Sequence, residues 1–342
     1  MPIPIIIGAV AAAAGIYGIV KGVGGAKDHS EAKDINESAQ SIIDDISAQI
    51  ESNREATNKT IEDYGQRKLR AFNGVINEFI VTFSRLQNVE LTHSSELEKL
   101  NASDFANTTL SDLKQNYQML KDAGLGLGAG MGSGAALAFG AYNGTMLLAT
   151  ASTGTAISSL SGVAATNATL AWLGGGSLAT GGFGMAGGMM VLGGIVAGPA
   201  LAIFGHILGN KGEEALNNAR SNLEQARTAH AEGVLIVDKL QTIETVTSLA
   251  NKAFSLICAR LRGAVHDMKN ALDSYGVNYR DFPQESKDAV YMAANYAKLL
   301  KIMIDTPILD QEGNLVLSTE RRIIDITAVA EGKKEKLDDS GE

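Results

Sequence analysis

Several residue types are scarce in this chain of 342 residues, which has one cysteine, one tryptophan and an aromatic content of 5%. The single cysteine, Cys258, cannot form an intramolecular disulfide, and it is compatible with a reducing compartment. Basic residues are outnumbered, since 29 Lys and Arg stand against 38 Asp and Glu and give a formal net charge of −9. This balance argues against nucleic acid as a partner and against recruitment to anionic lipid by charge alone.

Catalytic and metal-binding motifs are also missing. The five histidines lack metal-ligand spacing, and no H-E-x-x-H, C-x-x-C or Walker A pattern occurs. Residues 182–187 match G-x-G-x-x-G, but no strand precedes them and no acidic residue follows at the required distance. Cys258 has no base nearby in sequence, which favours a buried structural thiol. We therefore predict a protein that is not an enzyme and that uses no cofactor and no metal.

Charged residues are missing from one long stretch of the chain. Residues 123–210, eighty-eight in all, contain no Asp, Glu, Lys or Arg, and charged sequence begins at once on both sides. About 20 apolar residues cross a bilayer as a helix, so this uncharged run is long enough for two spans and a connection. Ser and Thr gather in residues 149–169. We therefore expect a helical hairpin with arms at residues 123–148 and 170–208 and its bend between them.

Glycine is abundant in this run, which holds twenty-three of the 38 glycines, many of them four residues apart. In a membrane such spacing lets helix backbones approach closely, whereas in water each glycine weakens a helix by about 0.5–1 kcal/mol relative to alanine. The spacing predicts glycine zippers and a segment able to change state. The residues expected to act in membrane insertion and helix packing are Gly126, Gly130, Gly134, Trp172, Gly184, Gly188, Gly194, Gly198, Pro199 and His206.

Three of these residues are not glycines. Trp172 falls near the expected bend, where it would be an interfacial anchor or would pack in a soluble core. Pro199 predicts a kink in the second arm of the hairpin. His206 is the only histidine of the run. It would tune insertion by changing charge near about pH 6.5 or, alternatively, sit at a helix end in the interface.

The N-terminal residues 1–25 form a second apolar segment, predicted to be a helix. No basic residue precedes Lys21, so the segment lacks the charged start of a secretory signal. A retained membrane helix is the favoured interpretation. The alternatives are a cleaved signal and a helix that packs beside the central run.

The regions on either side of the uncharged run are charged and amphipathic. In residues 26–122 and 211–304, apolar residues recur at three- and four-residue steps, which predicts two helical arms with apolar stripes. Gly65 and Gly74 suggest a weak point in the first arm. The near-heptad stripe of the second arm favours a long helix lying against the first.

The end of the chain differs in pattern. Gly276 and Pro283 are expected to end the long helix, and residues 285–304 to form another. In residues 305–342, short apolar stretches around a turn predict a small β-hairpin. A short helix at residues 320–330 and a charged tail follow. The hairpin would cap the bundle end or offer a docking edge to a partner.

Two charged helical arms around a long Gly/Ala-rich hairpin resemble the α-helical pore-forming cytolysins and the apolipoprotein L proteins. The resemblance lies in the hydropathy of residues 123–210, with residues 35–86 and 216–272 as the arms. The apolar residues 3–20 depart from the cytolysin pattern. The resemblance implies a protein that hides its hairpin while soluble or loosely attached, and that inserts and oligomerises on a trigger.

The predicted fold class is all-α: an elongated antiparallel helical bundle with a central Gly/Ala-rich hydrophobic helical hairpin and a small C-terminal β-hairpin. The predicted function is that of a membrane-inserting, oligomeric, pore-forming effector or toxin. The alternative is a helical scaffold or membrane-anchored interaction protein without pore activity. The expected partners are a lipid bilayer, further copies of the chain and a protein partner, with no nucleic acid. We expect a membrane-associated protein that interconverts with a soluble cytoplasmic or secreted form.

Overall fold

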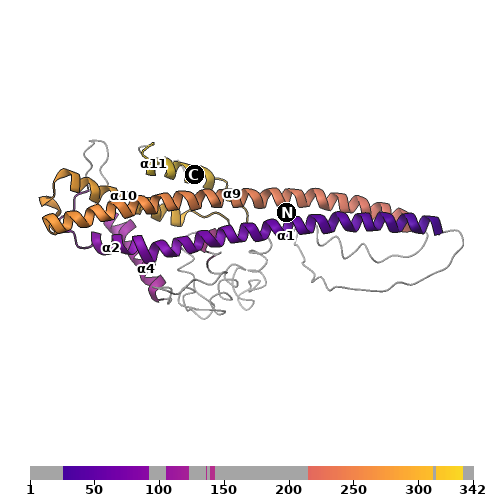
Figure 1. The fold of residues 1–342 in the computed structure, drawn as a ribbon, viewed down its shortest axis with the longest axis horizontal. Helices are drawn as coiled ribbons and strands as arrows, with labels where there is room; N and C mark the ends of the chain where they lie inside the picture. Colours follow the sequence, from indigo (N-terminus) through magenta and orange to yellow (C-terminus); the bar gives the residue numbers. More distant parts are fainter. Residues whose placement is uncertain are drawn as a thin grey trace. The chain divides into compact units, whose positions relative to one another are not determined.

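The computed structural model describes residues 26–91, 105–122, 136, 139–142, 215–310 and 313–333. About 85% of this part of the chain is helical and it contains no strands, so the predicted all-α fold class is confirmed. The elements are shown in Figure 1. They are α1 (Ala26–Ala71), the π-helix η1 (Phe72–Ile76), α2 (Asn77–Phe83), the π-helix η2 (Phe105–Leu110), α4 (Ser111–Asp122), α9 (Ala215–Tyr275), the 3-10 helix η6 (Tyr279–Asp281), α10 (Gln284–Asp305) and α11 (Thr319–Ala330).

The chain divides into two compact units. The first unit comprises Met1–Thr57 and Leu192–Thr242, and the second comprises Asn58–Val191 and Ile243–Glu342. Both long helices contribute to both units, since α1 and α9 each begin in the first and end in the second.

In the first unit, α1 and α9 lie side by side along an apolar seam (Figure 1). The seam is made of two clusters: Ala39 and Ile43 with Ala226 and Ala229, and Ile46 and Ile50 with Val237 and Leu240. Gly233 allows the close approach between them, because a Cβ there would collide with the side chain of Ile46. The small residues thus bring the backbones together, and the larger ones fill the remaining seam.

The two long helices run parallel. In the first unit, residue numbers rise together along α1 and α9 from one apolar cluster to the next. In the second unit the same direction continues from α1 into α2: Arg67 Nε of α1 donates to Asn251 Oδ1 at 2.6 Å, and Glu78 of α2 pairs with Lys269, further along α9, at 3.4 Å. The predicted antiparallel arrangement is therefore wrong for this pair. The many residues between the helices leave enough chain to return to the start of α1, and an apolar stripe carries no information on direction.

The second unit packs several helices around one core. In it, α2 contacts η1, α4 and α10, and α10 contacts η2 and α11. The core is built from large apolar side chains, among them Phe72, Phe79, Leu113, Leu120, Phe254, Ile257, Leu261, Leu300, Ile304, Ile323 and Ile326, all buried. Its helices therefore depend on side-chain burial, which stabilises by about 1.5–3 kcal/mol for each fully buried large residue.

The two glycines predicted to weaken the first arm behave differently. Gly74 lies inside η1 with a non-helical φ of −110° and ψ of −106°, so the predicted weak point is confirmed there. Gly65 lies within the uninterrupted helix α1, so it is not a weak point. Its missing side chain serves a contact instead.

Helix ends in the C-terminal half match the sequence signals. Gly276 adopts a φ of 76° directly after α9, a left-handed conformation that favours glycine. Pro283 precedes α10 with an extended ψ of 160°. The predicted further helix and short helix are confirmed as α10 and α11, each within one residue of its expected bounds.

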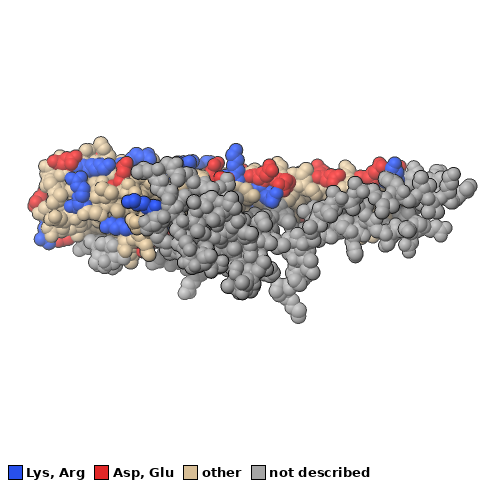
Figure 2. Space-filling view, turned by 90° about the horizontal axis from the view of Figure 1, so that it is seen from below, with Lys and Arg blue, Asp and Glu red and all other residues tan. Residues whose placement is uncertain are grey.

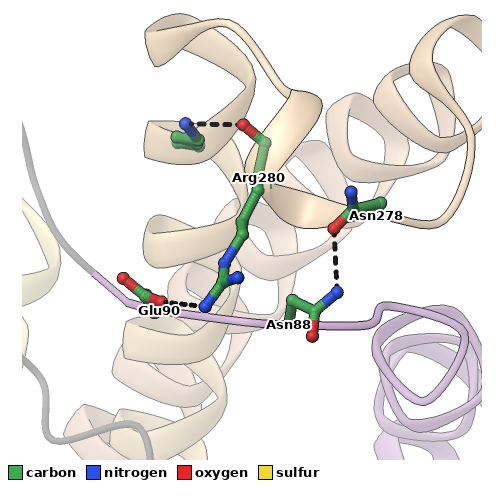
Figure 3. Close-up of polar contacts among 5 residues, drawn as sticks. Asn88, Glu90, Asn278 and Arg280 are labelled. Carbon is green, nitrogen blue, oxygen red and sulfur yellow. Dashed lines mark hydrogen bonds and ion pairs between the residues drawn. The ribbon is translucent and has the colours of Figure 1, made fainter.

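A polar clip joins the chain after α2 to the chain after α9. Gln87 N donates to Val277 O at 2.8 Å, and Tyr279 N donates to Gln87 O at 3.0 Å. Side chains add a hydrogen bond from Asn88 Nδ2 to Asn278 Oδ1 at 3.1 Å and an ion pair between Glu90 and Arg280 at 3.0 Å (Figure 3). The ion pair is exposed and contributes little, so the backbone bonds chiefly hold the two segments together.

The predicted C-terminal β-hairpin is not shown. Leu309 and Leu315 form one isolated antiparallel bridge, and Asp310 N donates to Asn314 O at 2.9 Å. Gly313 has a φ of 79° in this turn. The described residues of this region thus make a turn closed by a single bridge, with no strands, while residues 311–312 lie outside the described part.

On the face seen in Figure 2, basic and acidic side chains are intermixed over the described surface. No helix among the described residues is both long enough and apolar enough to cross a membrane.

Candidate functional site: the seat of the uncharged run on α1

Part of the uncharged run lies against α1 in the second unit. The described part is Ala136 and residues 139–142, here called the run segment, and it is helical except at Tyr142. Ala136, Phe139, Ala141 and Tyr142 are all buried. The run segment is thus covered by the second unit, while the rest of the run, which we predict to be hidden in the soluble form, lies outside the described residues.

The run segment and α1 touch backbone to backbone at two glycines. A Cβ built at Gly65 would overlap the carbonyl oxygen of Ala136 and lie 2.9 Å from the backbone nitrogen of Gly140. A Cβ at Gly140 would overlap the carbonyl oxygen of Ile61 and lie 2.9 Å from its carbonyl carbon. Neither backbone can move aside as a flexible side chain could. Only glycine fits at both positions.

One turn beyond this crossing, the side chain of Lys68 enters the same contact. Lys68 has no exposed surface, an unusual state for lysine. Its Nζ donates to Phe139 O at 3.0 Å and to Tyr142 O at 3.5 Å. The same atom lies 4.5 Å from the centroid of the Tyr64 ring and 5.3 Å from that of Phe139. The amine therefore fixes α1 to two backbone carbonyls of the run segment.

Burial sets the charge of this amine. Loss of solvation lowers the pKa of Lys68 from 10.5 to about 7, while the carboxylate of Asp305 acts in the opposite direction. Burial prevails because the low-dielectric surroundings disfavour the charged form. Near neutral pH the side chain is therefore a mixture of amine and ammonium, and a small change in its surroundings changes its charge.

Two tyrosines contact the amine, Tyr64 through its ring and Tyr142 through its backbone carbonyl. Tyr64 donates its hydroxyl to Met303 O at 3.4 Å and packs edge-on against Phe254, with ring centroids 5.8 Å apart. Burial raises the pKa of Tyr64. The hydroxyl oxygen of Tyr142 is buried and has no hydrogen-bond partner among the described residues. Burial, followed by the charge of Asp310, raises its pKa to about 12, so both phenols are neutral at physiological pH.

Residues that follow α10 also hold the run segment. Ile308 N and Leu309 N donate to the same carbonyl, Ala141 O, at 2.8 and 3.0 Å. The run segment thus receives hydrogen bonds from two parts of the second unit, α1 and the chain after α10.

The contact of Gly65 and Lys68 with the run segment is here called the seat. An ionic network extends from the seat to α4. Lys301 of α10 pairs with Asp305 and with Asp112 of α4, the latter at 3.4 Å. Because α4 ends directly before the uncharged run, this pair ties the lead-in of the run to α10. Asp305 therefore links the network to Lys68, whose charge it favours.

Two other candidate sites are a reactive thiol at Cys258 and a metal site. Cys258 is half-buried, and burial raises its thiol pKa to about 12 against the opposing charges of Arg262 and Arg67. The thiol is therefore protonated and unreactive at neutral pH, as expected of a structural thiol. Within the described residues, no group of three His, Cys, Asp or Glu side chains is placed to hold a metal ion.

None of the predicted insertion and packing residues falls in the described part of the chain. The structure therefore does not place Gly126, Gly130, Gly134, Trp172, Gly184, Gly188, Gly194, Gly198, Pro199 or His206. The residues at the seat that sequence reasoning missed are Gly140, Tyr142 and Lys68. A signal for Lys68 existed, because it interrupts the buried series Ile61, Tyr64, Phe72 at helical spacing. A lysine in a core stripe is a stronger indication of a special site than a scattered histidine.

Comparisons of this chain with protein-family models, with curated proteins and with solved structures find no match. The resemblance to pore-forming cytolysins and apolipoprotein L proteins therefore stays a prediction based on hydropathy.

Proposed function

We propose that the protein is a membrane-inserting, pore-forming effector or toxin whose uncharged run leaves its seat on α1, enters a bilayer, oligomerises and permeabilises it. One observation carries the proposal: the run segment is held through glycine contacts and a buried amine as well as through apolar packing. The proposed partners are the lipid bilayer and further copies of the chain.

The buried amine of Lys68 favours a contact from which the run segment can be released. Desolvating an ion costs several kcal/mol, of which two carbonyls and two ring faces return only a part. A methionine or leucine at position 68 would fill a permanent core without this cost. The lysine therefore favours a contact that is specific in geometry but limited in strength, as a reversible seat requires.

The length and composition of the run support the bilayer as its alternative environment. The eighty-eight residues without Asp, Glu, Lys or Arg exceed twice the length of one span. Their glycines weaken helices in water but allow tight helix pairs in lipid. The proposed inserted form is a helical hairpin packed through these faces, first within one chain and then between chains.

A second candidate is a membrane-anchored scaffold that makes no pore. The observation in its favour is the α1–α9 seam of the first unit, where layers of alanine and isoleucine pair two long helices. Such a pair presents a rigid helical surface to another protein. In this case the uncharged run would serve only to anchor the scaffold to the membrane.

Vesicle experiments distinguish the two candidates. The purified chain is expected to float with liposomes and to release an entrapped dye, whereas an anchor floats without leakage. Val196→Asp, in the expected second arm of the hairpin, should strongly reduce leakage, since a carboxylate at the bilayer centre costs about 3 kcal/mol. The matched control is Leu235→Asp at an exposed position of α9, which should leak normally. Flotation without leakage would favour the scaffold, and absence of both would contradict insertion.

A further inference from the structure

The side chain of Lys68 reaches from α1 to two carbonyl oxygens that both belong to the run segment. Any movement of the run segment away from α1 therefore breaks both hydrogen bonds and exposes the amine to water. We propose that this contact is a proton-operated latch: protonation of Lys68 weakens the seat of the run segment, so that acidification promotes its release. The inference rests on the proposed function, since release of the run is the step that precedes insertion.

The hydrogen-bond geometry fits the neutral amine. A neutral amine has two N–H donors, and the Lys68 nitrogen has two carbonyl acceptors, on Phe139 and Tyr142. An ammonium has three donors. Among the described residues its third donor meets only the faces of the Tyr64 and Phe139 rings. The seat is thus complete for the neutral form and incomplete for the charged form.

The groups around Lys68 leave it as the one that titrates. The Tyr64 ring of α1 and the backbone carbonyl of Tyr142 in the run segment contact the amine, and burial raises the pKa of both phenols. From α9, Cys258 lies near Tyr64, and burial raises its pKa to about 12. From the end of α10, Asp305 favours the ammonium but shares its charge with Lys301. The phenols and the thiol therefore stay protonated while the amine changes charge.

The direction of the effect follows from linkage. Burial lowers the pKa of Lys68 from 10.5 to about 7 in the closed seat, and opening restores the ordinary value. Between these two values the open state binds more protons than the closed state, so acid favours opening. The two-state expression predicts an opening equilibrium about fiftyfold larger at pH 7 than at pH 9, and less than about twofold larger again at pH 6.

Thiol labelling of the full chain without lipid tests the latch. In a Cys258→Ser background, Ala141→Cys places a buried reporter in the run segment. Its alkylation rate, divided by the rate in urea-unfolded protein at the same pH, gives the open fraction. With Lys68 present, the open fraction should rise about fiftyfold from pH 9 to pH 7. In Lys68→Met, the open fraction should not depend on pH and should be lower than in the parent chain. Lys59→Met, at an exposed position of the same helix, should behave like the parent chain.

An equal pH dependence with Lys68 and with Met at position 68 would overturn the latch. If the Ala141→Cys chain does not fold, urea unfolding of the natural chain and of Lys68→Met from pH 6 to pH 9 replaces it. Between pH 9 and pH 7, the ratio of their unfolding constants should then change by the same factor of about fifty, and a constant ratio would refute the proposal. Neither experiment uses vesicles. A negative result would therefore contradict the latch without contradicting dye release, and a chain that releases no dye from vesicles can still show pH-dependent opening.

Discussion

Alanine at Gly140 will detach the run segment from α1 and lower the free energy of unfolding by about 3 kcal/mol, and alanine at Gly65 will do the same. In an ordinary helix, glycine to alanine stabilises by up to about 1 kcal/mol, so the predicted sign is reversed. The reason is that each new Cβ would occupy the place of a backbone oxygen on the facing segment. Urea unfolding followed by circular dichroism measures the effect.

Gly263 of α9 provides the matched control for these two variants. A Cβ at this position meets no atom within 4 Å. Gly263→Ala should therefore stabilise the protein by about 0.5–1 kcal/mol. If Gly140→Ala and Gly65→Ala behaved like Gly263→Ala, the backbone crossing would not exist in solution.

Leucine at both Gly130 and Gly194 is expected to separate membrane binding from leakage. The substitutions make the run more apolar, so vesicle binding should persist or increase. They also push neighbouring helices apart at the faces proposed to pair, so leakage per bound protein and cross-linked oligomers should fall at least about tenfold. Dye release and cross-linking at equal amounts of bound protein provide the measurement.

The control for the double variant adds the same apolar bulk beside the glycine faces rather than on them. Ala129→Leu with Ala197→Leu is suitable, because each position immediately precedes a zipper glycine and, in the expected helical hairpin, would lie about 100° around the helix from it. This control should leak normally. Undiminished leakage from Gly130→Leu with Gly194→Leu would remove the zipper from the mechanism and favour a simple anchor.

Sequence reasoning predicted the features that depend on local chemistry. The apolar periodicity of the arms predicted long helices, and Gly276 and Pro283 predicted where α9 ends and α10 begins. These signals act within a few residues, because glycine and proline restrict or release the backbone where they stand. The uncharged run was visible for the same reason, since charge can be read directly from the sequence.

Features that depend on distant contacts were not predictable in this way. An apolar stripe identifies a buried face but neither its partner nor its direction, so the parallel course of α1 and α9 was missed. Gly65 was interpreted as a weak point because glycine lowers helix propensity, although its value here lies in the space it leaves for Ala136. Lys68 was overlooked because lysines are usually exposed, and its two acceptors come from a segment about seventy residues away.

The fluorescence of Trp172 tests the central claim most directly, because it is the only tryptophan and it lies within the uncharged run. On addition of vesicles that carry brominated acyl chains, its emission should shift to shorter wavelength and be quenched by the lipid, while an aqueous quencher loses access. These changes would place the run in the bilayer. Unchanged emission and full access for the aqueous quencher, in protein that floats with the vesicles, would contradict insertion of the run.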